Sequence, residues 1–186
     1  MQYSYPQGKF CCLFTGFLSC RHSGVWYWLT PVLLFFLSSA AFTKLHHAIK
    51  GAGNKSTARN AWQVIANIVW AAISSALFLF TRNEIFILLF IAFVAAVTAD
   101  TWASEIGPLL NKRCFSLAKM RMVPAGTNGG ISFFGSLAAL SGATIVSSLS
   151  YYIFFGAWQR DIIAILSVSA FIACFADSLL GAFVRR

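Results

Sequence analysis

Acidic residues are scarce in this sequence. Only five Asp and Glu stand against 14 Lys and Arg, which gives a net charge of +9, and charged residues make up just 10% of the chain. A typical soluble domain carries about a quarter charged residues. Because 59% of the residues are hydrophobic, more than a single soluble core can hide, the composition excludes an ordinary soluble fold.

Several familiar catalytic and binding motifs are also missing. The sequence has no P-loop, no protein-kinase motif set and no zinc motif. Its five cysteines include no CxxC pair, so neither a zinc site nor a disulfide framework is indicated. The basic residues fall between apolar runs, where membrane topology and anionic lipid headgroups account for them. We therefore expect no nucleic-acid partner.

Long apolar runs are abundant. About 20 apolar residues cross a bilayer core as a helix, and runs that are continuous rather than alternating favour helices over a β-barrel. We predict an all-α membrane protein, a polytopic helical bundle with about five transmembrane helices. The expected spans are residues 25–43, 61–80, 85–106, 130–155 and 162–184.

The chain divides into two parts. Residues 1–24 are expected to form a short apolar or interfacial segment, and residues 25–186 a single transmembrane helical domain. Ten of the 14 Lys and Arg lie in the two long connections and at the C-terminus, against four on the other side. Because Lys and Arg are enriched in cytoplasmic loops, we expect the long basic loops and the C-terminus in the cytoplasm and the N-terminus outside.

Three acidic residues fall inside predicted spans. Asp100 and Asp177 each lie about 15 residues into helices of the same direction, roughly 22 Å along the axis, and Glu105 follows Asp100. The two aspartates are thus at matching depth, about 7 Å from the cytoplasmic edge of a core about 30 Å thick. A charge at a helix centre costs about 2.5–3.5 kcal/mol, so such residues usually face a cavity, a partner or a bound ion. The alternative is a polar cluster that only joins helices.

Further polar residues fall at the same level. Gln63 and Asn67 lie one turn apart on one face of the second predicted span, near its cytoplasmic end. We add three hydroxyl residues beside the acids to the candidate site: Thr101, Ser104 and Ser178. By contrast, we interpret His46 and His47 as interfacial side chains.

A glycine-rich segment, VPAGTNGG at 123–130, precedes the fourth predicted helix. We expect Thr127 or Asn128 to cap this helix and the amides of Gly129 and Gly130 to stay open at its N-terminus. Such an N-terminus suits a phosphate, although glycines also serve turns and tight helix packing. Four basic residues lie upstream in the same connection: Lys112, Arg113, Lys119 and Arg121. Acids for Mg²⁺ and amides plus bases for phosphates are the parts that phosphoryl transfer needs.

Two motifs occur together, ADTWASEIG at 99–107 and VPAGTNGG at 123–130. The combination resembles the integral membrane family that includes plant phytyl phosphate kinase and the vertebrate transmembrane protein nineteen group, also called domain of unknown function ninety-two. Three further stretches agree with that family: FFLSSAAFTK at 35–44, RNAWQVIAN at 59–67 and ADSLLGA at 176–182. The resemblance covers roughly residues 25–183.

The resemblance implies an enzyme that phosphorylates an isoprenoid monophosphate to the diphosphate with a nucleoside triphosphate. More distantly, the D-T-x-A-S pattern is similar to that of the CTP-dependent polyprenol and dolichol kinases. Carried over by position, Asp100, Glu105 and Asp177 would be catalytic and hold Mg²⁺ and the nucleotide. The residues that would bind phosphate or line the pocket are Gly126, Thr127, Asn128, Gly129, Gly130, Gln63 and Asn67, and Arg121 is added as a base of the same connection.

Two other hypotheses remain open. Ala-Asp-Thr at 99–101 and Ala-Asp-Ser at 176–178 lie in parallel helices, as in a repeat that meets at a shared site of an ion-coupled transporter. Family members also usually carry more membrane segment before the first motif and more chain after ADSLLGA, so we expect a shortened form, and the second alternative is a non-catalytic truncated member. The expected partners are the lipid bilayer and an isoprenoid phosphate; the sequence does not indicate an oligomeric state.

Overall fold

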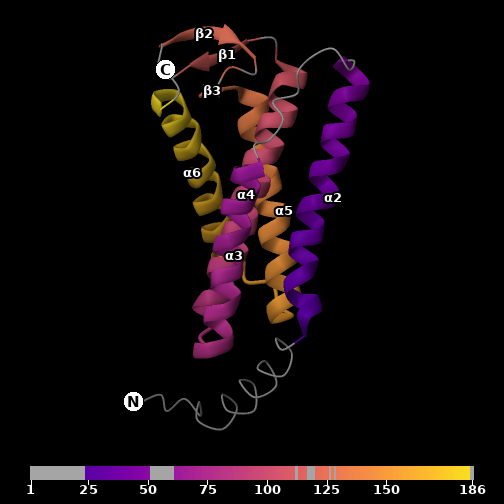
Figure 1. Cartoon of the computed structure of the whole chain (residues 1–186), viewed down its shortest axis with the longest axis vertical. Coiled ribbons are helices and arrows are strands. Elements are labelled where there is room, and N and C mark those ends of the chain that lie inside the picture. The colour runs from indigo at the N-terminus through magenta and orange to yellow at the C-terminus, as the bar shows by residue number, and fades with distance from the viewer. Residues whose placement is uncertain are drawn as a thin grey trace, which may run out of the picture.

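A computed structural model describes residues 24–50, 61–111, 113–116, 120–125, 127 and 129–184, without the side chains of residues 47, 50, 61–68 and 181–184. Over these residues the chain forms five long helices and a small sheet (Figure 1). The helices are α2 (Val25–Lys50), α3 (Ala61–Thr81), α4 (Ile85–Leu110), α5 (Phe133–Phe155) and α6 (Arg160–Val184). The strands are β1 (Arg113–Ser116), β2 (Arg121–Pro124) and β3 (Gly130–Ile131). The expected interfacial segment at 1–24 lies almost wholly outside the described residues.

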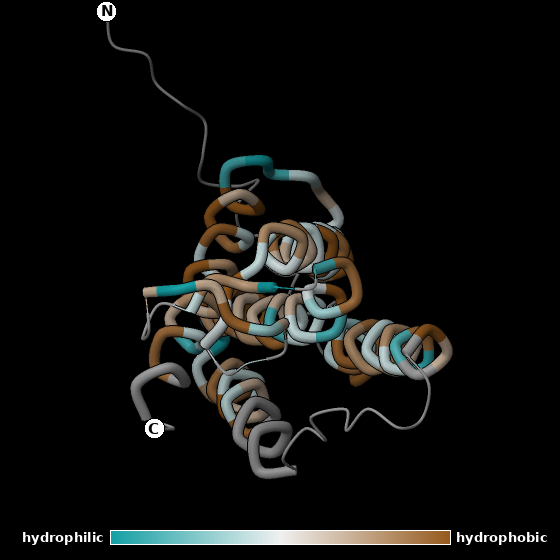
Figure 2. Tube along the Cα trace, turned by 90° about the horizontal axis from the view of Figure 1, so that it is seen from above, coloured by the Kyte–Doolittle hydropathy of each residue, from teal (hydrophilic) through white to brown (hydrophobic). Residues whose placement is uncertain are grey.

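The helices have the length and composition of membrane spans. In the described part of the chain, four segments are long and apolar enough to cross a bilayer: Val25–His46, Ile85–Leu110, Phe133–Phe155 and Arg160–Leu180. The part of α3 with described side chains, Val69–Thr81, is apolar but shorter. Hydrophobic residues run along the helices in Figure 2. Because a helix satisfies its own backbone hydrogen bonds, this architecture suits lipid, and the predicted polytopic helical bundle is confirmed.

The predicted spans agree with most helix ends. The first three helices start at residues 25, 61 and 85, as the apolar runs predicted. Two ends differ. α4 continues through Pro108 to Leu110, past the predicted end at 106, and α5 begins at Phe133 rather than at residue 130. The later start follows from the sheet, since residues 130–131 are already paired as β3.

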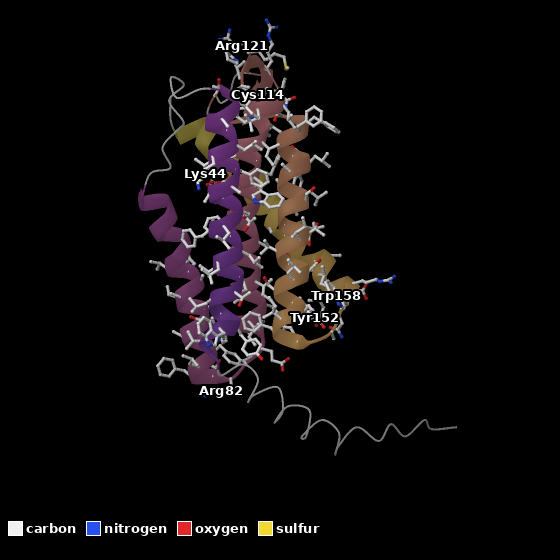
Figure 3. The ribbon with its side chains drawn as sticks, turned by 90° about the vertical axis from the view of Figure 1, so that its right-hand side faces the viewer. Lys44, Arg82, Cys114, Arg121, Tyr152 and Trp158 are labelled. Atoms are coloured by element: carbon white, nitrogen blue, oxygen red, sulfur yellow. The ribbon has the colours of Figure 1, made fainter. Side chains whose placement is uncertain are left out.

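The connection between α4 and α5 folds into a three-stranded sheet. β1 lies in the middle of the order β2-β1-β3 and pairs antiparallel with both neighbours. Cys114 of β1 is opposite Val123 of β2, and both side chains are buried, whereas Arg113 and Phe115 on either side of Cys114 are exposed. The sheet lies at one end of the bundle (Figure 1). In Figure 3, Arg121 and Cys114 lie at this sheet end, and Lys44 lies further along the bundle in the same half.

α4 is the central helix of the bundle. It packs against α2, α3, α5 and α6. Three of its side chains, Ile87, Ile91 and Ala95, are completely buried at one-turn intervals. Helix packing in lipid depends on close van der Waals contact, so α4 supplies the surface on which the other helices are assembled.

Aromatic side chains fill the end of the bundle away from the sheet. The Trp28 ring of α2 lies 5.6 Å from Phe78 of α3, 4.9 Å from Phe90 of α4 and 5.0 Å from Phe154 of α5, measured between centroids. Tilted and edge-to-face pairs at such distances are favourable beyond the area they bury. One tryptophan therefore joins four helices.

Glycines allow α4 and α5 to approach closely near the sheet. A Cβ on Gly135 of α5 would lie 2.7 Å from the Ser132 hydroxyl and 3.3 Å from the Ala103 carbonyl of α4. A Cβ on Gly107 of α4 would lie 3.4 Å from the Gly135 Cα. Small residues at helix crossings are the usual device for such contact in membranes. Gly107, the last residue of the ADTWASEIG motif, thus has a packing role.

Candidate functional site

Side chains from two of the family motifs join α2 to α4. The Trp102 indole N–H of α4 donates to the Ser38 hydroxyl of α2 at 3.3 Å. The Phe42 ring of α2 meets the Trp102 ring edge to face, with centroids 4.8 Å apart. Because Ser38 and Phe42 belong to FFLSSAAFTK and Trp102 to ADTWASEIG, these two stretches form one contact surface.

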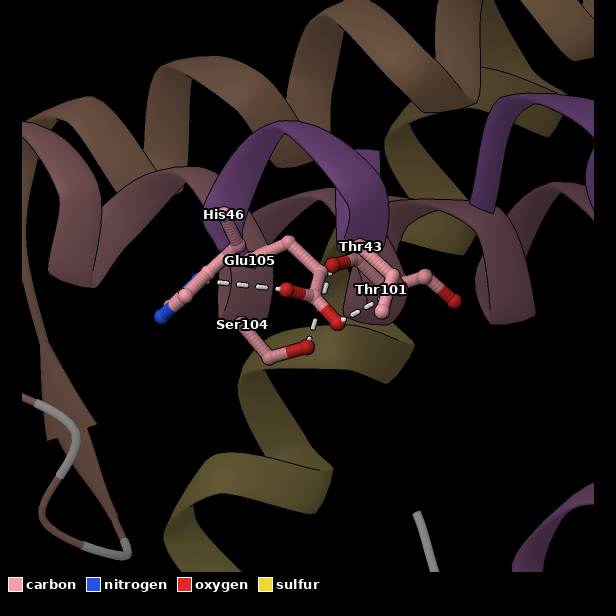
Figure 4. A network of polar contacts seen from close by, with 5 residues as sticks. All are labelled: Thr43, His46, Thr101, Ser104 and Glu105. Atoms are coloured by element: carbon pink, nitrogen blue, oxygen red, sulfur yellow. Dashed lines mark hydrogen bonds and ion pairs between the residues drawn. The ribbon is translucent and has the colours of Figure 1, made fainter. Parts of the chain in front are cut away.

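Glu105 joins the same two helices (Figure 4). The Thr43 hydroxyl of α2 donates to Oε1 of Glu105 at 3.1 Å. His46 Nδ1, one turn further along α2, lies 3.3 Å from Oε2, an ion-pair distance without hydrogen-bond geometry. The His46 and Glu105 side chains are 15% and 20% exposed. Both oxygens of the Glu105 carboxylate therefore face groups of α2.

Asp100 and Asp177 form a separate acidic pair between α4 and α6. The two helices pack together, and the negative charge of Asp100 acts on the Asp177 carboxylate. Asp100 is half-buried and Asp177 is exposed. The two aspartates that the sequence placed at matching depth thus lie on neighbouring helices.

The three candidate acids are not one cluster. Among the residues that the structure describes, no three His, Cys, Asp or Glu side chains come together as a metal site. Helix geometry explains the separation: five residues at about 100° each put Asp100 and Glu105 about 140° apart around α4. Asp100 therefore faces Asp177 of α6, and Glu105 faces α2.

Two carboxylates are enough for one kind of metal site. Mg²⁺ is commonly held by one or two carboxylates together with substrate phosphates, rather than by a cage made only of protein ligands. A divalent cation between Asp100 and Asp177 would also remove their mutual repulsion. The donor chemistry of this pair fits Mg²⁺ bound with a nucleotide, whereas Glu105 is already engaged by Thr43 and His46.

The hydroxyl residues of the candidate site bond to their own helix where their contacts are described. Thr101 is 1% exposed, and its hydroxyl donates to the Val97 carbonyl at 2.7 Å. Ser104 is exposed and donates to the Thr101 carbonyl at 3.0 Å. Ser178 of α6 is half-buried, one residue after Asp177. Thr101 therefore faces the helix interface.

The predicted helix cap was wrong. Ser132 caps α5, its hydroxyl accepting from the Gly135 amide at 3.1 Å. Thr127 instead donates its hydroxyl to the Pro124 carbonyl at 2.6 Å, as part of a turn. The expected capping by Asn128 concerns a residue outside the described part, and the cap position is taken by Ser132. The physical reason is that Gly130 pairs with β1, so the helix cannot start before the strand ends.

The predicted open amides are also corrected in part. The Gly130 amide donates to the Thr127 carbonyl at 3.0 Å, so it does not stay open at a helix N-terminus. A Cβ on Gly130 would collide with the Cys114 sulfur. Gly129 has a φ of 72°, a left-handed backbone that favours glycine. Both glycines therefore have structural reasons to be there.

Several predicted site residues are only partly described or lie beyond the described residues. Gln63 and Asn67 belong to α3, but their side chains are outside the described part. Gly126, Lys112 and Lys119 also fall outside it. Arg113 and Arg121 are exposed on the sheet, and Figure 3 shows Arg121 at that end of the bundle. α4 leads directly into this sheet, and Asp100 lies in the half of α4 nearer to it.

The similarity of this chain to a known family covers almost its whole length. The model of the family described as "Integral membrane protein DUF92" matches residues 2–186. This chain belongs to that family. An uncharacterized membrane protein of Methanocaldococcus jannaschii is 31% identical to this chain over 174 residues. The matched residues are 92% of this chain and 70% of the archaeal protein. No solved structure matches this chain significantly.

Two further relatives come from photosynthetic organisms. An uncharacterized membrane protein of Synechocystis is 28% identical over 168 residues, which is 87% of this chain and 64% of that protein. The chloroplastic protein VTE6 of Arabidopsis thaliana is 28% identical over 100 residues, which is 54% of this chain and 29% of that protein. The chain therefore spans less than two thirds of the length of these two relatives.

Proposed function

We propose that this chain is part of a membrane-embedded phosphotransferase that converts an isoprenoid monophosphate to the diphosphate with a nucleoside triphosphate. The observation that carries the proposal is the pair of aspartates, Asp100 and Asp177, which lie on two neighbouring helices toward the sheet end of the bundle. The membership in the DUF92 family and the similarity to a chloroplastic plant protein are consistent with a lipid-soluble substrate.

The proposed reaction assigns a role to each group. An oxygen of the isoprenoid phosphate attacks the γ-phosphorus, the bond to the bridging oxygen breaks, and the nucleoside diphosphate leaves. Asp100 and Asp177 would hold Mg²⁺, which neutralises charge on the nucleotide phosphates. Arg113 and Arg121 raise the positive potential above the same end. The isoprenoid chain lies between helices within the membrane, and the phosphate of the substrate reaches the aspartate pair.

Glu105 has a different role in this proposal. Since Thr43 and His46 engage both of its carboxylate oxygens, Glu105 is a positioning residue that holds α2 against α4.

In this proposal the sheet end faces the cytoplasm. The count of Lys and Arg favours this side for the long connections, and nucleotides are supplied there.

The test is phosphate transfer by the purified protein in detergent with Mg²⁺. Radiolabelled CTP, ATP, GTP or UTP is offered with phytyl, farnesyl or geranylgeranyl monophosphate. A labelled diphosphate is expected, with at least about a hundredfold loss of rate in Asp100→Asn and in Asp177→Asn. The matched control is Asp161→Asn, an exposed acid at the start of α6, which should keep full activity.

Two outcomes contradict the proposal. Undiminished transfer by Asp100→Asn would remove that residue from the reaction. No diphosphate either from this chain or from a full-length DUF92 relative with the same motifs would reject the kinase and favour an ion-coupled carrier. A carrier exposes its site to both sides in turn, so a cysteine at position 100 would then react with a thiol reagent added from either side.

A further inference from the structure

A groove of about 610 Å³ lies between α5 and α6, extending toward the end of the bundle away from the sheet. This volume is in the range of ligand pockets, about 300–1,000 Å³. On the α5 side the groove is lined by Leu140, Thr144 and Ser148. On the α6 side it is lined by Ile163, Ala164, Ser167 and Val168. Trp158 and Arg160 form its mouth. The groove lies away from the aspartate pair, which is toward the sheet end.

The mouth of the groove lies at the level of the lipid headgroups. Trp158 is 57% exposed and stacks on Tyr152, with ring centroids 5.1 Å apart (Figure 3). Tryptophan and tyrosine collect at membrane–water interfaces. From this level the groove extends inward along α5, where Ser148 and Leu140 are eight residues, or about 12 Å, apart.

The mouth carries positive charge. Arg160 is exposed and is the first residue of α6, so its guanidinium lies beside the positive end of the helix dipole. Asp161 follows it but does not line the groove. Within the described part of the chain, no ion pair ties Arg160 to an acidic side chain. A guanidinium at the interface is well suited to a phosphate.

The interior of the groove suits a hydrocarbon chain. Leu140, Ile163 and Val168 are apolar, and two of the hydroxyls in the wall are already satisfied. Thr144 donates to the Leu140 carbonyl at 2.8 Å, and Ser167 donates to the Ile163 carbonyl at 2.7 Å. These hydroxyls therefore present mainly carbon atoms to an occupant, and a chain can enter without breaking their hydrogen bonds.

We propose that this groove binds one anionic phospholipid of the leaflet opposite the sheet. Its phosphate lies against Arg160 and Trp158, and one acyl chain lies along the stripe from Ser148 to Leu140. The positively charged mouth favours a lipid over the apolar helix of a second copy of this chain. The site is independent of the proposed kinase reaction, because it is built from other residues near the other end of the bundle.

The test is native mass spectrometry of the full chain in detergent, titrated with phosphatidylglycerol, phosphatidylcholine or glycerol phosphate. One phosphatidylglycerol is expected to bind at least about fivefold more tightly than phosphatidylcholine, and glycerol phosphate should not bind measurably. Arg160→Gln should weaken phosphatidylglycerol binding about tenfold, the size of one charge-assisted hydrogen bond. Ala164→Phe, which fills the groove, should abolish binding of this lipid.

Matched controls come from outside the groove. Arg82→Gln changes an exposed arginine at the same end of the bundle, and Ala41→Phe enlarges an exposed alanine on α2; both should bind phosphatidylglycerol as the unmodified chain does. Equal binding of the two phospholipids, unaffected by Arg160→Gln, would overturn the proposal. Tight binding of glycerol phosphate alone would indicate a free-phosphate site. A changed oligomeric mass in Ala164→Phe, with lipid binding intact, would indicate that a second copy occupies the groove.

Discussion

The contact of Glu105 with α2 can be measured as a coupling energy. Thr43 donates to one carboxylate oxygen at 3.1 Å, and His46 lies 3.3 Å from the other. Thr43→Val removes the first contact and keeps the shape of the side chain. Glu105→Gln removes the charge and keeps the length. Hydrogen bonds to charged groups contribute about 1.5–3 kcal/mol in water-soluble proteins, while interhelical hydrogen bonds measured in membranes average about 0.6 kcal/mol.

The expected coupling follows from these limits. Glu105 is 20% exposed, so its bond to Thr43 should contribute about 1 kcal/mol to the free energy of unfolding. For a chain of this size that corresponds to a fall in Tm of roughly 2–4 °C for Thr43→Val. Glu105→Gln should lower Tm further, because it also weakens the contact with His46. The fall in Tm of the double variant should be smaller than the sum of the falls in the two single variants.

The assay is thermal unfolding in detergent followed by near-ultraviolet circular dichroism, for the two single variants and the double variant. The control is Thr30→Val, since the Thr30 hydroxyl donates to the Trp26 carbonyl within α2. This control should shift Tm by less than about 1 °C. Strictly additive losses for Thr43→Val and Glu105→Gln would show that the two side chains do not interact, and the reasoning would fail.

Two further substitutions test the fold. Trp28→Ala should destabilise the bundle by about 3–5 kcal/mol, since the ring joins four helices; Trp26→Ala, at a position that is 76% exposed, should cost far less in the same thermal assay. Ser132→Ala should cost about 1 kcal/mol and speed hydrogen exchange in the first turn of α5, while Thr127→Ala, at the cap position first predicted, should leave that exchange unchanged.

The membrane architecture was largely predictable because the apolar runs are long and the polar connections between them are distinct. Residues 82–84 and 156–159 are connections of only a few residues between long apolar runs, so they reverse the chain, and Gly156 ends α5 with a φ of 66°. The sheet was not predictable in this way. Its strands have four, four and two residues, too few for an alternating pattern to stand out.

The candidate site was predicted in its membership more than in its arrangement. The depth of Asp100 and Asp177 followed from counting residues along two parallel helices. The separation of Glu105 could have been derived as well, from its angle around α4. The contact with His46 could not, because it depends on how far α2 continues past Thr43 and on the rotation of α2 against α4. No local signal in the sequence reports either quantity.

The central position of α4 has a consequence for how the protein is made. Asp177 lies 77 residues after Asp100 in the chain, and at about 5–20 residues per second a ribosome needs roughly 4–15 s to synthesise that interval. For most of this time α4 is complete, while Asp177 has not yet been synthesised. α5 is synthesised first, so the glycine contact between Gly107 and Gly135 is available to hold α4 in place before the last helix arrives. The order of synthesis thus lets tight packing form before the like charges meet.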